Sequence, residues 1–322
     1  MGTNSILSPI QNDLQQVETL LRESVQVDFA PLSGVFETLI ESGGKRIRPA
    51  LALLATKFHP TDPDQAATLA VAIELVHAAT LIHDDLIDKS PVRRGSPTVN
   101  SRWSGTATVL AGDYLLARAA DIASGIENLR VMRIFARTLM IICDGEIRQD
   151  FGGVHWPPNR EEYFRHIQSK TASLFKAATE TGAVLSGAPE AEIDALAAFG
   201  HNLGMAFQIA DDILDFTADE QALGKPVGSD LRQGTLTLPV FYFIAQDPRG
   251  PRVEALLERS DRDGDEMEDL VQAIRNSPAV VASEQEARRF AQAAIDAIAI
   301  LPDNIYRRAM TELAQYVVER TL

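Results

Sequence analysis

The chain has 322 residues, of which 45% are hydrophobic and 6% aromatic, and a formal net charge of -15. This length can bury a sizeable core in one large domain or in two average ones. The negative charge argues against nucleic-acid binding, which needs a basic face. The single cysteine, Cys143, excludes an intrachain disulfide and favours a reducing compartment, and we expect its side chain to be buried. Residues 1–8 do not resemble a signal peptide, so a cytoplasmic location is expected.

Almost every segment has helical periodicity, and no segment alternates with the period of a strand. Helices are expected over residues 12–27, 32–42, 48–58, 63–88, 105–124, 128–151, 159–185, 189–215, 236–245, 252–258, 266–275, 283–300 and 305–320. Asp62 and Asn159 are suited to cap the helices that follow them, and Ser283 with Glu286 has the spacing of a capping box. The polar stretch 217–234 is expected to be a long loop.

No linker rich in Pro or Ser divides the chain, so the helices predict one all-α domain over residues 1–322. Its central helix is apolar and long enough to cross a bilayer, but Glu74, His77 and His83 interrupt it. This favours a buried helix of a soluble protein, without a transmembrane segment. Helices rich in alanine leave apolar faces to bury, and a homodimer is therefore expected.

The central helix ends in HDDLID, where Asp84, Asp85 and Asp88 form the pattern DDxxD. Residues three and four apart lie on one face of a helix, where like charges repel each other. A divalent ion held together with substrate phosphates, above all Mg²⁺, removes that conflict. A single cluster of this kind is more often solvated surface.

The same pattern occurs again in QIADDILD, as Asp211, Asp212 and Asp215. It also stands near the C-terminal end of an apolar helix, and Gln208 lies three residues before it, where it can contact whatever the metals hold. Two such faces opposed across a helical bundle predict a site for several Mg²⁺ ions around one diphosphate.

Cations that can contact phosphate occur in three places. Lys45, Arg46 and Arg48 stand at a helix entry in GGKRIRP. Arg93 and Arg94 follow the first DDxxD motif, and Lys170 and Lys225 come later in the chain. His77 lies two helical turns before Asp84 on the same face, which makes a phosphate contact credible. His83 has no such placement and is interpreted as a satisfied core residue.

The sequence lacks a nucleophile elbow, a zinc motif and a dinucleotide-binding loop. The remaining groups are carboxylates for metals, cations for phosphates and an apolar helical interior. This combination suits metal-assisted departure of a diphosphate, with an apolar pocket that shields the resulting cation from water.

Four segments, GGKRIRP, HDDLIDKSPVRRG, FQIADDILD and GKPVGSDLRQGTLTLP, resemble in order and spacing the trans-type polyprenyl synthetase (trans-isoprenyl diphosphate synthase) family. The resemblance implies an all-α helical bundle around a central cavity, the isoprenoid synthase type, usually homodimeric. It also implies Mg²⁺-dependent condensation of isopentenyl diphosphate with an allylic diphosphate. Ionisation gives an allylic cation, the isopentenyl double bond attacks it, and the released diphosphate takes the proton.

The resemblance assigns residues to three groups. The predicted metal ligands are the two aspartate motifs, Asp84, Asp85, Asp88, Asp211, Asp212 and Asp215, of which the resemblance names all but Asp212. The allylic diphosphate is contacted by Arg93, Lys170, Thr171, Gln208 and Lys225. The isopentenyl diphosphate is bound by Lys45, Arg48, His77 and Arg94.

Two positions concern substrate affinity and product length. After Asp230 the family often has Gly-Lys, but Thr235 follows Gly234 here, so one phosphate-facing cation is absent. Bulky aromatics one turn deeper than the first motif stop elongation early in the family. In this chain the residues at that depth are Thr80 and Ala79, with Val76 one turn further, and all three are small. Their small size predicts a product of C20 or longer.

Two alternatives remain. A class I terpene cyclase shares an aspartate-rich helix, but its second metal motif is normally of Asn/Ser/Glu type and it needs no second diphosphate site. A subunit of a heteromeric polyprenyl diphosphate synthase usually loses aspartates, whereas both motifs are complete here.

Overall fold

The computed structural model describes residues 3–41, 44–93, 96–152, 159–218, 226–259 and 264–320. The described chain is almost entirely helical, which confirms the all-α prediction, and it divides into two compact units. Unit 1 comprises Met1–Leu139, Leu174–Gly200 and Ala297–Glu312; unit 2 comprises Met140–Ser173, His201–Asp296 and Leu313–Leu322. The single domain over residues 1–322 stays a prediction.

The N-terminal elements all belong to unit 1. In chain order they are α1 Thr3–Ile6, η1 Ser8–Ile10, α2 Gln11–Ser24, α3 Ala30–Glu41, α4 Ile47–Thr56, α5 Pro63–Ile87, β1 Val92–Arg93, β2 Ser96–Pro97, α6 Val99–Arg102 and α7 Gly105–Ser124. Helices α8 Leu129–Gly152 and α11 Glu190–Thr217 begin in unit 1 and end in unit 2, and α10 covers Ser173–Leu185.

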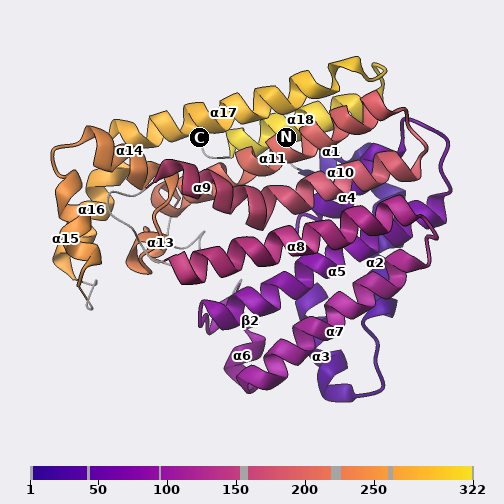
Figure 1. Cartoon of the computed structure of the whole chain (residues 1–322), viewed down its shortest axis with the longest axis horizontal. Coiled ribbons are helices and arrows are strands. Elements are labelled where there is room, and N and C mark those ends of the chain that lie inside the picture. Colours follow the sequence, from indigo (N-terminus) through magenta and orange to yellow (C-terminus); the bar gives the residue numbers. More distant parts are fainter. Residues whose placement is uncertain are drawn as a thin grey trace. The chain divides into compact units, whose positions relative to one another are not determined.

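Helix α5 is the central element of unit 1. Asp62 caps it as predicted, since its side chain accepts a hydrogen bond from the backbone N–H of Asp64 over 2.9 Å, and Pro63 begins the first turn. The helix is apolar on every side and packs against α2, α4 and α7 (Figure 1). It is long and apolar enough to cross a membrane, but most of it is buried in the fold. This burial agrees with the prediction of a core helix.

Unit 2 carries the remaining elements, apart from η3 and most of α18. They are α9 Arg160–Ile167, the π-helical turn η2 Gln168–Ala172, α13 Ser229–Arg232, α14 Leu238–Gln246, α15 Gly250–Leu257, α16 Asp265–Arg275 and α17 Pro278–Ala297. The two excepted elements are η3 Ile298–Ile300, in unit 1, and α18 Ile305–Glu319, which begins in unit 1 and ends in unit 2. Asn159 caps α9 through a hydrogen bond from the N–H of Glu161. One apolar cluster joins Phe216 and Phe243 to α15 and α16, and a second contains Tyr163 and Ile209.

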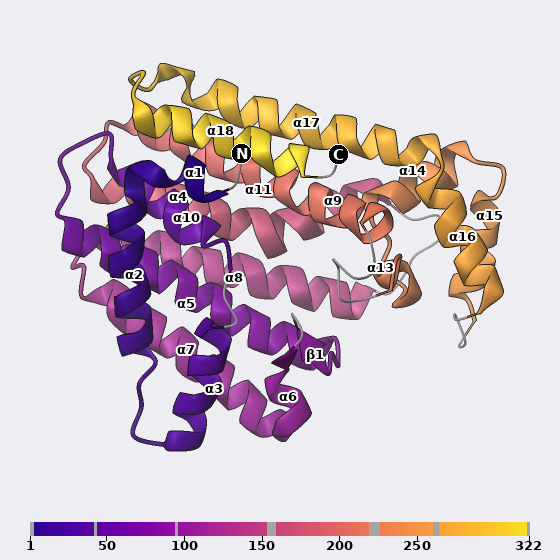
Figure 2. The same cartoon turned by 180° about the vertical axis from the view of Figure 1, so that it is seen from behind.

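Four expectations are wrong. The stretch 217–234, expected to be a loop, contains the short helix α13. Residues 92–97 contain two antiparallel strands of two residues each, where only a loop was expected; they follow the C-terminal end of α5 (Figure 2). Ser283 lies inside α17 and donates to the carbonyl of Ala279, so it is not a cap, because α17 begins at Pro278. Cys143 is exposed on α8.

Candidate active site

The three aspartates of the first motif have different surroundings in unit 1. Asp84 is half-buried and Asp88 is exposed, but Asp85 is only 4% exposed. Successive residues of a helix are rotated by about 100°, so neighbouring aspartates cannot share a direction. The Nε of Arg93 donates a hydrogen bond to Asp85 Oδ1 over 2.7 Å. Burial raises the pKa of Asp85, although the hydrogen bond from Arg93 lowers it.

One face of α5 leads away from this motif. His77, Thr80 and Asp84, spaced three and four residues apart, are all half-buried, whereas Val76 and Ala79 are at most 1% exposed. The prediction that His77 shares a face with Asp84 is consistent with this pattern. Of the three predicted chain-length residues, Thr80 therefore has the most accessible side chain.

His83 lies on a different side of α5, as the interpretation of a packed residue requires. Its Nε2 is 3.2 Å from the carbonyl oxygen of Val109 on α7. This contact supports a packing role rather than a substrate contact.

The basic cluster after α3 contains one structural arginine. Arg46 donates to Glu18 over 2.6 Å and to Glu74 over 2.7 Å, and it adopts a left-handed backbone conformation before α4. Lys45 is exposed, while the guanidinium of Arg48 lies 4.8 Å from the ring centroid of Phe175. Arg46 therefore has a structural role, whereas the roles of Lys45 and Arg48, two of the four residues predicted to bind isopentenyl diphosphate, stay predictions.

The second motif lies near the end of α11, in unit 2. The side chain of Asp211 is 41% exposed, whereas Asp212 and Asp215 are 4% and 2% exposed. The Nη2 of Arg320 donates to Asp211 Oδ1 over 2.7 Å, and the N–H of Asp230 donates to Asp215 Oδ2 over 3.1 Å. As in the first motif, the second aspartate points into the protein.

Both carboxylate oxygens of Asp212 have protein partners. The hydroxyl of Tyr163 donates to Oδ2 over 2.6 Å, and Gln208 Nε2 donates to Oδ1 over 2.9 Å. Burial raises the pKa of Asp212 well above its ordinary value, although these hydrogen bonds lower it. A buried carboxylate with these partners differs from the metal ligand that the sequence pattern predicts.

Lys170 and Thr171 lie on the π-helical turn η2, a distortion that is frequent at functional sites. Lys170 Nζ is 3.3 Å from Glu146 Oε2 on α8. The hydroxyl of Thr171 donates to Gln208 Oε1 over 2.7 Å. The structure thus brings Thr171 together with Gln208 and Asp212, which were predicted from a distant segment.

Three residues at this site were not predicted: Glu146, Tyr163 and Arg320. Each contacts a predicted residue through the tertiary structure, and no spacing within its own segment marks it. Arg94 and Lys225, predicted to bind the two diphosphates, lie outside the described residues.

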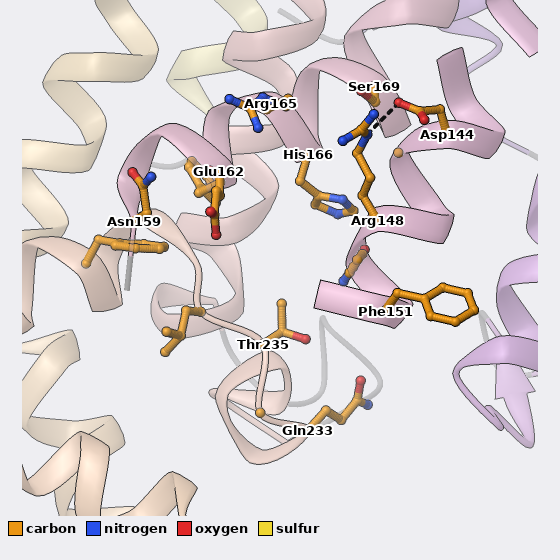
Figure 3. Close-up of a pocket in the computed structure, with 16 residues that line it drawn as sticks. Asp144, Arg148, Phe151, Asn159, Glu162, Arg165, His166, Ser169, Gln233 and Thr235 are labelled. Atoms are coloured by element: carbon orange, nitrogen blue, oxygen red, sulfur yellow. Dashed lines mark hydrogen bonds and ion pairs between the residues drawn. The ribbon is translucent and has the colours of Figure 1, made fainter. Parts of the chain in front are cut away.

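Thr235 lines a pocket of about 650 Å³ in unit 2, between α8, α9 and the segment before α14 (Figure 3). The ring of His166 points into this pocket from α9, and its Nδ1 is buried without a hydrogen-bond partner among the described residues. Burial, together with the charge of Lys170, lowers the pKa of His166 from 6.5 to about 4. Arg148, on the α8 side, is paired with Asp144 over 2.7 Å.

Comparison with known proteins agrees with these features. The family model for polyprenyl synthetase matches residues 30–274. Heptaprenyl diphosphate synthase component 2 of Geobacillus stearothermophilus is 39% identical and aligns over 99% of each chain. The all-trans-nonaprenyl-diphosphate synthase (geranyl-diphosphate specific) of Rhodobacter capsulatus is 36% identical over 98% of this chain and 97% of its own.

A solved structure has nearly the same fold. The polyprenyl synthase of Caulobacter crescentus, complexed with calcium and isoprenyl diphosphate, superposes with a TM-score of 0.93 at 36% identity, over 100% of this chain and 98% of that one. The match of the family model, the full-length relatives and the superposition agree with the paired DDxxD motifs. The chain belongs to the polyprenyl synthetase family.

Proposed function

We propose that this chain, a long-chain trans-prenyltransferase by family, holds an allylic diphosphate through Mg²⁺ bound to both DDxxD motifs. It condenses isopentenyl diphosphate with the allylic diphosphate and releases diphosphate, which gives an all-trans polyprenyl diphosphate of C20 or longer. The supporting observation is that each motif keeps its first aspartate, Asp84 or Asp211, partly accessible on a helix that is otherwise largely buried.

The donor set fits Mg²⁺. Asp84 and Asp88 stand four residues apart on α5, and carboxylate oxygens are the ligands that Mg²⁺ prefers. Among the described residues, no three Asp, Glu, His or Cys side chains converge as a ready metal cluster. This favours ions that are completed by substrate phosphates over an all-protein cage. When bound, they would offset the charge that develops on the leaving diphosphate.

The chain's own cations would hold and orient the substrates. Arg93, Lys170 and Lys225 would contact the allylic diphosphate, together with Thr171 and Gln208. Lys45, Arg48, His77 and Arg94 would bind isopentenyl diphosphate. The apolar interior excludes water from the allylic cation, so that the isopentenyl double bond attacks it first.

Product length follows from the residues below the first motif. The face of α5 beneath Asp84 carries Thr80 and no aromatic side chain at that depth, which leaves room for a long tail. The relatives are named for heptaprenyl and nonaprenyl products, and we assign this chain to the same long-chain class.

A homodimer in the cytoplasm is the proposed form. Exposed apolar side chains on α7 include Val109, Leu110 and Tyr114, and those on α8 include Met140, Ile147 and Phe151. Burying such side chains in a symmetric interface removes them from water. A heteromer is the alternative, since one relative is named component 2 of a heptaprenyl diphosphate synthase. The mass of the purified protein in solution, measured with activity, distinguishes a self-sufficient homodimer from a subunit that needs a partner.

The activity is tested with pure protein, Mg²⁺, labelled isopentenyl diphosphate and C5, C10, C15 or C20 primers, with products sized by chromatography. Extension to C20 or beyond, abolished by EDTA, is expected. Extension that stops at C15 would refute the product class, and cyclic hydrocarbons would indicate a terpene cyclase. Absence of any product from the isolated chain would favour the heteromeric form.

A further inference from the structure

A chain of hydrogen bonds connects three elements of unit 2. It runs from Tyr163 on α9 to Asp212 on α11, from Asp212 to Gln208 one turn earlier, and from Gln208 to Thr171 on η2. The three donor–acceptor distances are 2.6, 2.9 and 2.7 Å, all within the normal range for their types. Asp212 and Thr171 are buried, and Tyr163 packs against Phe164 and Phe241.

This series of hydrogen bonds fixes the orientation of the Gln208 amide. Its NH₂ group can only donate, so it faces Asp212 Oδ1, and its oxygen then faces the hydroxyl of Thr171. Tyr163 occupies the other oxygen of Asp212, which removes the freedom of the carboxylate to rotate. Without Tyr163 and Asp212, the amide would lose the contact that selects one of its two orientations.

The oriented groups border the accessible part of the second motif. Gln208 and Asp211 are three residues apart on α11, both half-buried, so they share a face. Thr171 follows Lys170 on the π-helical turn. A ligand that reaches Asp211 on this face therefore meets the oriented amide as well.

We propose that Tyr163 and Asp212 are positioning residues, which orient Gln208 and Thr171 toward the allylic diphosphate, and that Asp212 is not a metal ligand. The inference rests on the proposed function for the identity of the substrate. The claim that Asp212 is not a metal ligand can be tested without turnover, since metal binding can be measured separately from activity.

The metal part is tested by binding of Mn²⁺ in the presence of a non-ionisable allylic thiodiphosphate, followed by electron paramagnetic resonance, to the wild type, Asp211→Asn and Asp212→Asn. In Asp212→Asn, the amide oxygen can still accept a hydrogen bond from Gln208, and the amide NH₂ can donate one to the hydroxyl oxygen of Tyr163. We expect Asp212→Asn to bind Mn²⁺ within twofold of the wild type, and Asp211→Asn to bind at least tenfold more weakly. Equal weakening in both variants would overturn the assignment of Asp212.

The positioning part is tested by Tyr163→Phe, with Tyr242→Phe as a matched control in the same apolar cluster. Loss of a hydrogen bond to a carboxylate predicts a rise of about tenfold in KM for the allylic substrate, with KM for isopentenyl diphosphate unchanged. Tyr242→Phe should change neither. An unchanged allylic KM in Tyr163→Phe, or an equal rise for both substrates, contradicts the inference. If the wild type makes no product, the proposed function fails, while the Mn²⁺ result still decides the role of Asp212.

Discussion

Arg320 holds the first carboxylate of the second aspartate motif. Its Nη2 donates to Asp211 Oδ1 over 2.7 Å and to the carbonyl of Phe207 over 3.1 Å, and its guanidinium lies 4.3 Å from the ring centroid of Phe207. Three contacts to one helix fix the arginine, and the arginine in turn restricts Asp211. The most C-terminal arginine of the chain thus supports a predicted metal ligand far from it in sequence.

Arg320→Met should therefore weaken the use of Mg²⁺. Partners that orient a metal ligand typically contribute about tenfold or more to metal affinity, so the half-saturating Mg²⁺ concentration is expected to rise by about that factor. Activity measured over a series of Mg²⁺ concentrations gives the value, with Arg307→Met, which contacts the carbonyls of Ala299 and Leu301, as a control. A Mg²⁺ requirement equal to or lower than that of the wild type would show that Arg320 does not support the site.

Asp84→Ala and Asp211→Ala should each lower turnover by orders of magnitude, because each removes a carboxylate proposed to bind Mg²⁺ on the leaving diphosphate. Asp194→Ala, at an exposed position of the same helix as Asp211, is the control and should retain wild-type turnover. Steady-state rates at saturating substrate check this. Near-normal activity of either of the first two variants would exclude that residue as a metal ligand.

Thr80→Phe should shorten the product, because a phenyl ring one helical turn below Asp84 would block the path of the growing tail. Ala79→Phe should also shorten the product. Ala79 is 0% exposed, so a ring there also overpacks the core and is expected to destabilise the fold by about 1–3 kcal/mol. Product chromatography and thermal unfolding separate the two effects; an unchanged product distribution in Thr80→Phe would remove this residue from the tunnel wall.

His166 should make stability depend on pH. Its pKa is about 4 in the fold, below the ordinary 6.5, so between these values the unfolded chain binds a proton that the folded chain does not. The free energy of unfolding should therefore fall as the pH decreases from 7 to 4. Urea unfolding should show a smaller fall for His166→Asn than for the wild type, and equal falls would mean that this histidine does not contribute.

The sequence predicted features that depend on neighbouring residues in the chain. The caps at Asp62 and Asn159 and the helix Gly105–Ser124 follow from local signals and were found as expected. Ser283 shows the limit of such signals: it has the spacing of a capping box, but α17 already begins at Pro278 and the residue is buried in its interior.

The sequence could not show which aspartates turn inward. Asp85 and Asp212 are indistinguishable from their neighbours by pattern, and only the positions of Arg93 and Tyr163 reveal their buried partners. Arg320 is likewise invisible to a motif, because its contact with Asp211 depends on tertiary packing. The motifs therefore predict where a site lies, whereas the fold decides which of their oxygen atoms are accessible.

The sharing of one diphosphate by the two motifs is tested most directly by a crystal structure of the protein with Mn²⁺ and a non-ionisable allylic thiodiphosphate, in which anomalous scattering locates the metal. Ions bound to Asp84 and to Asp211 should contact oxygens of the same diphosphate. Metal at only one motif, or ions at both motifs that touch no common diphosphate, would contradict the proposed mechanism.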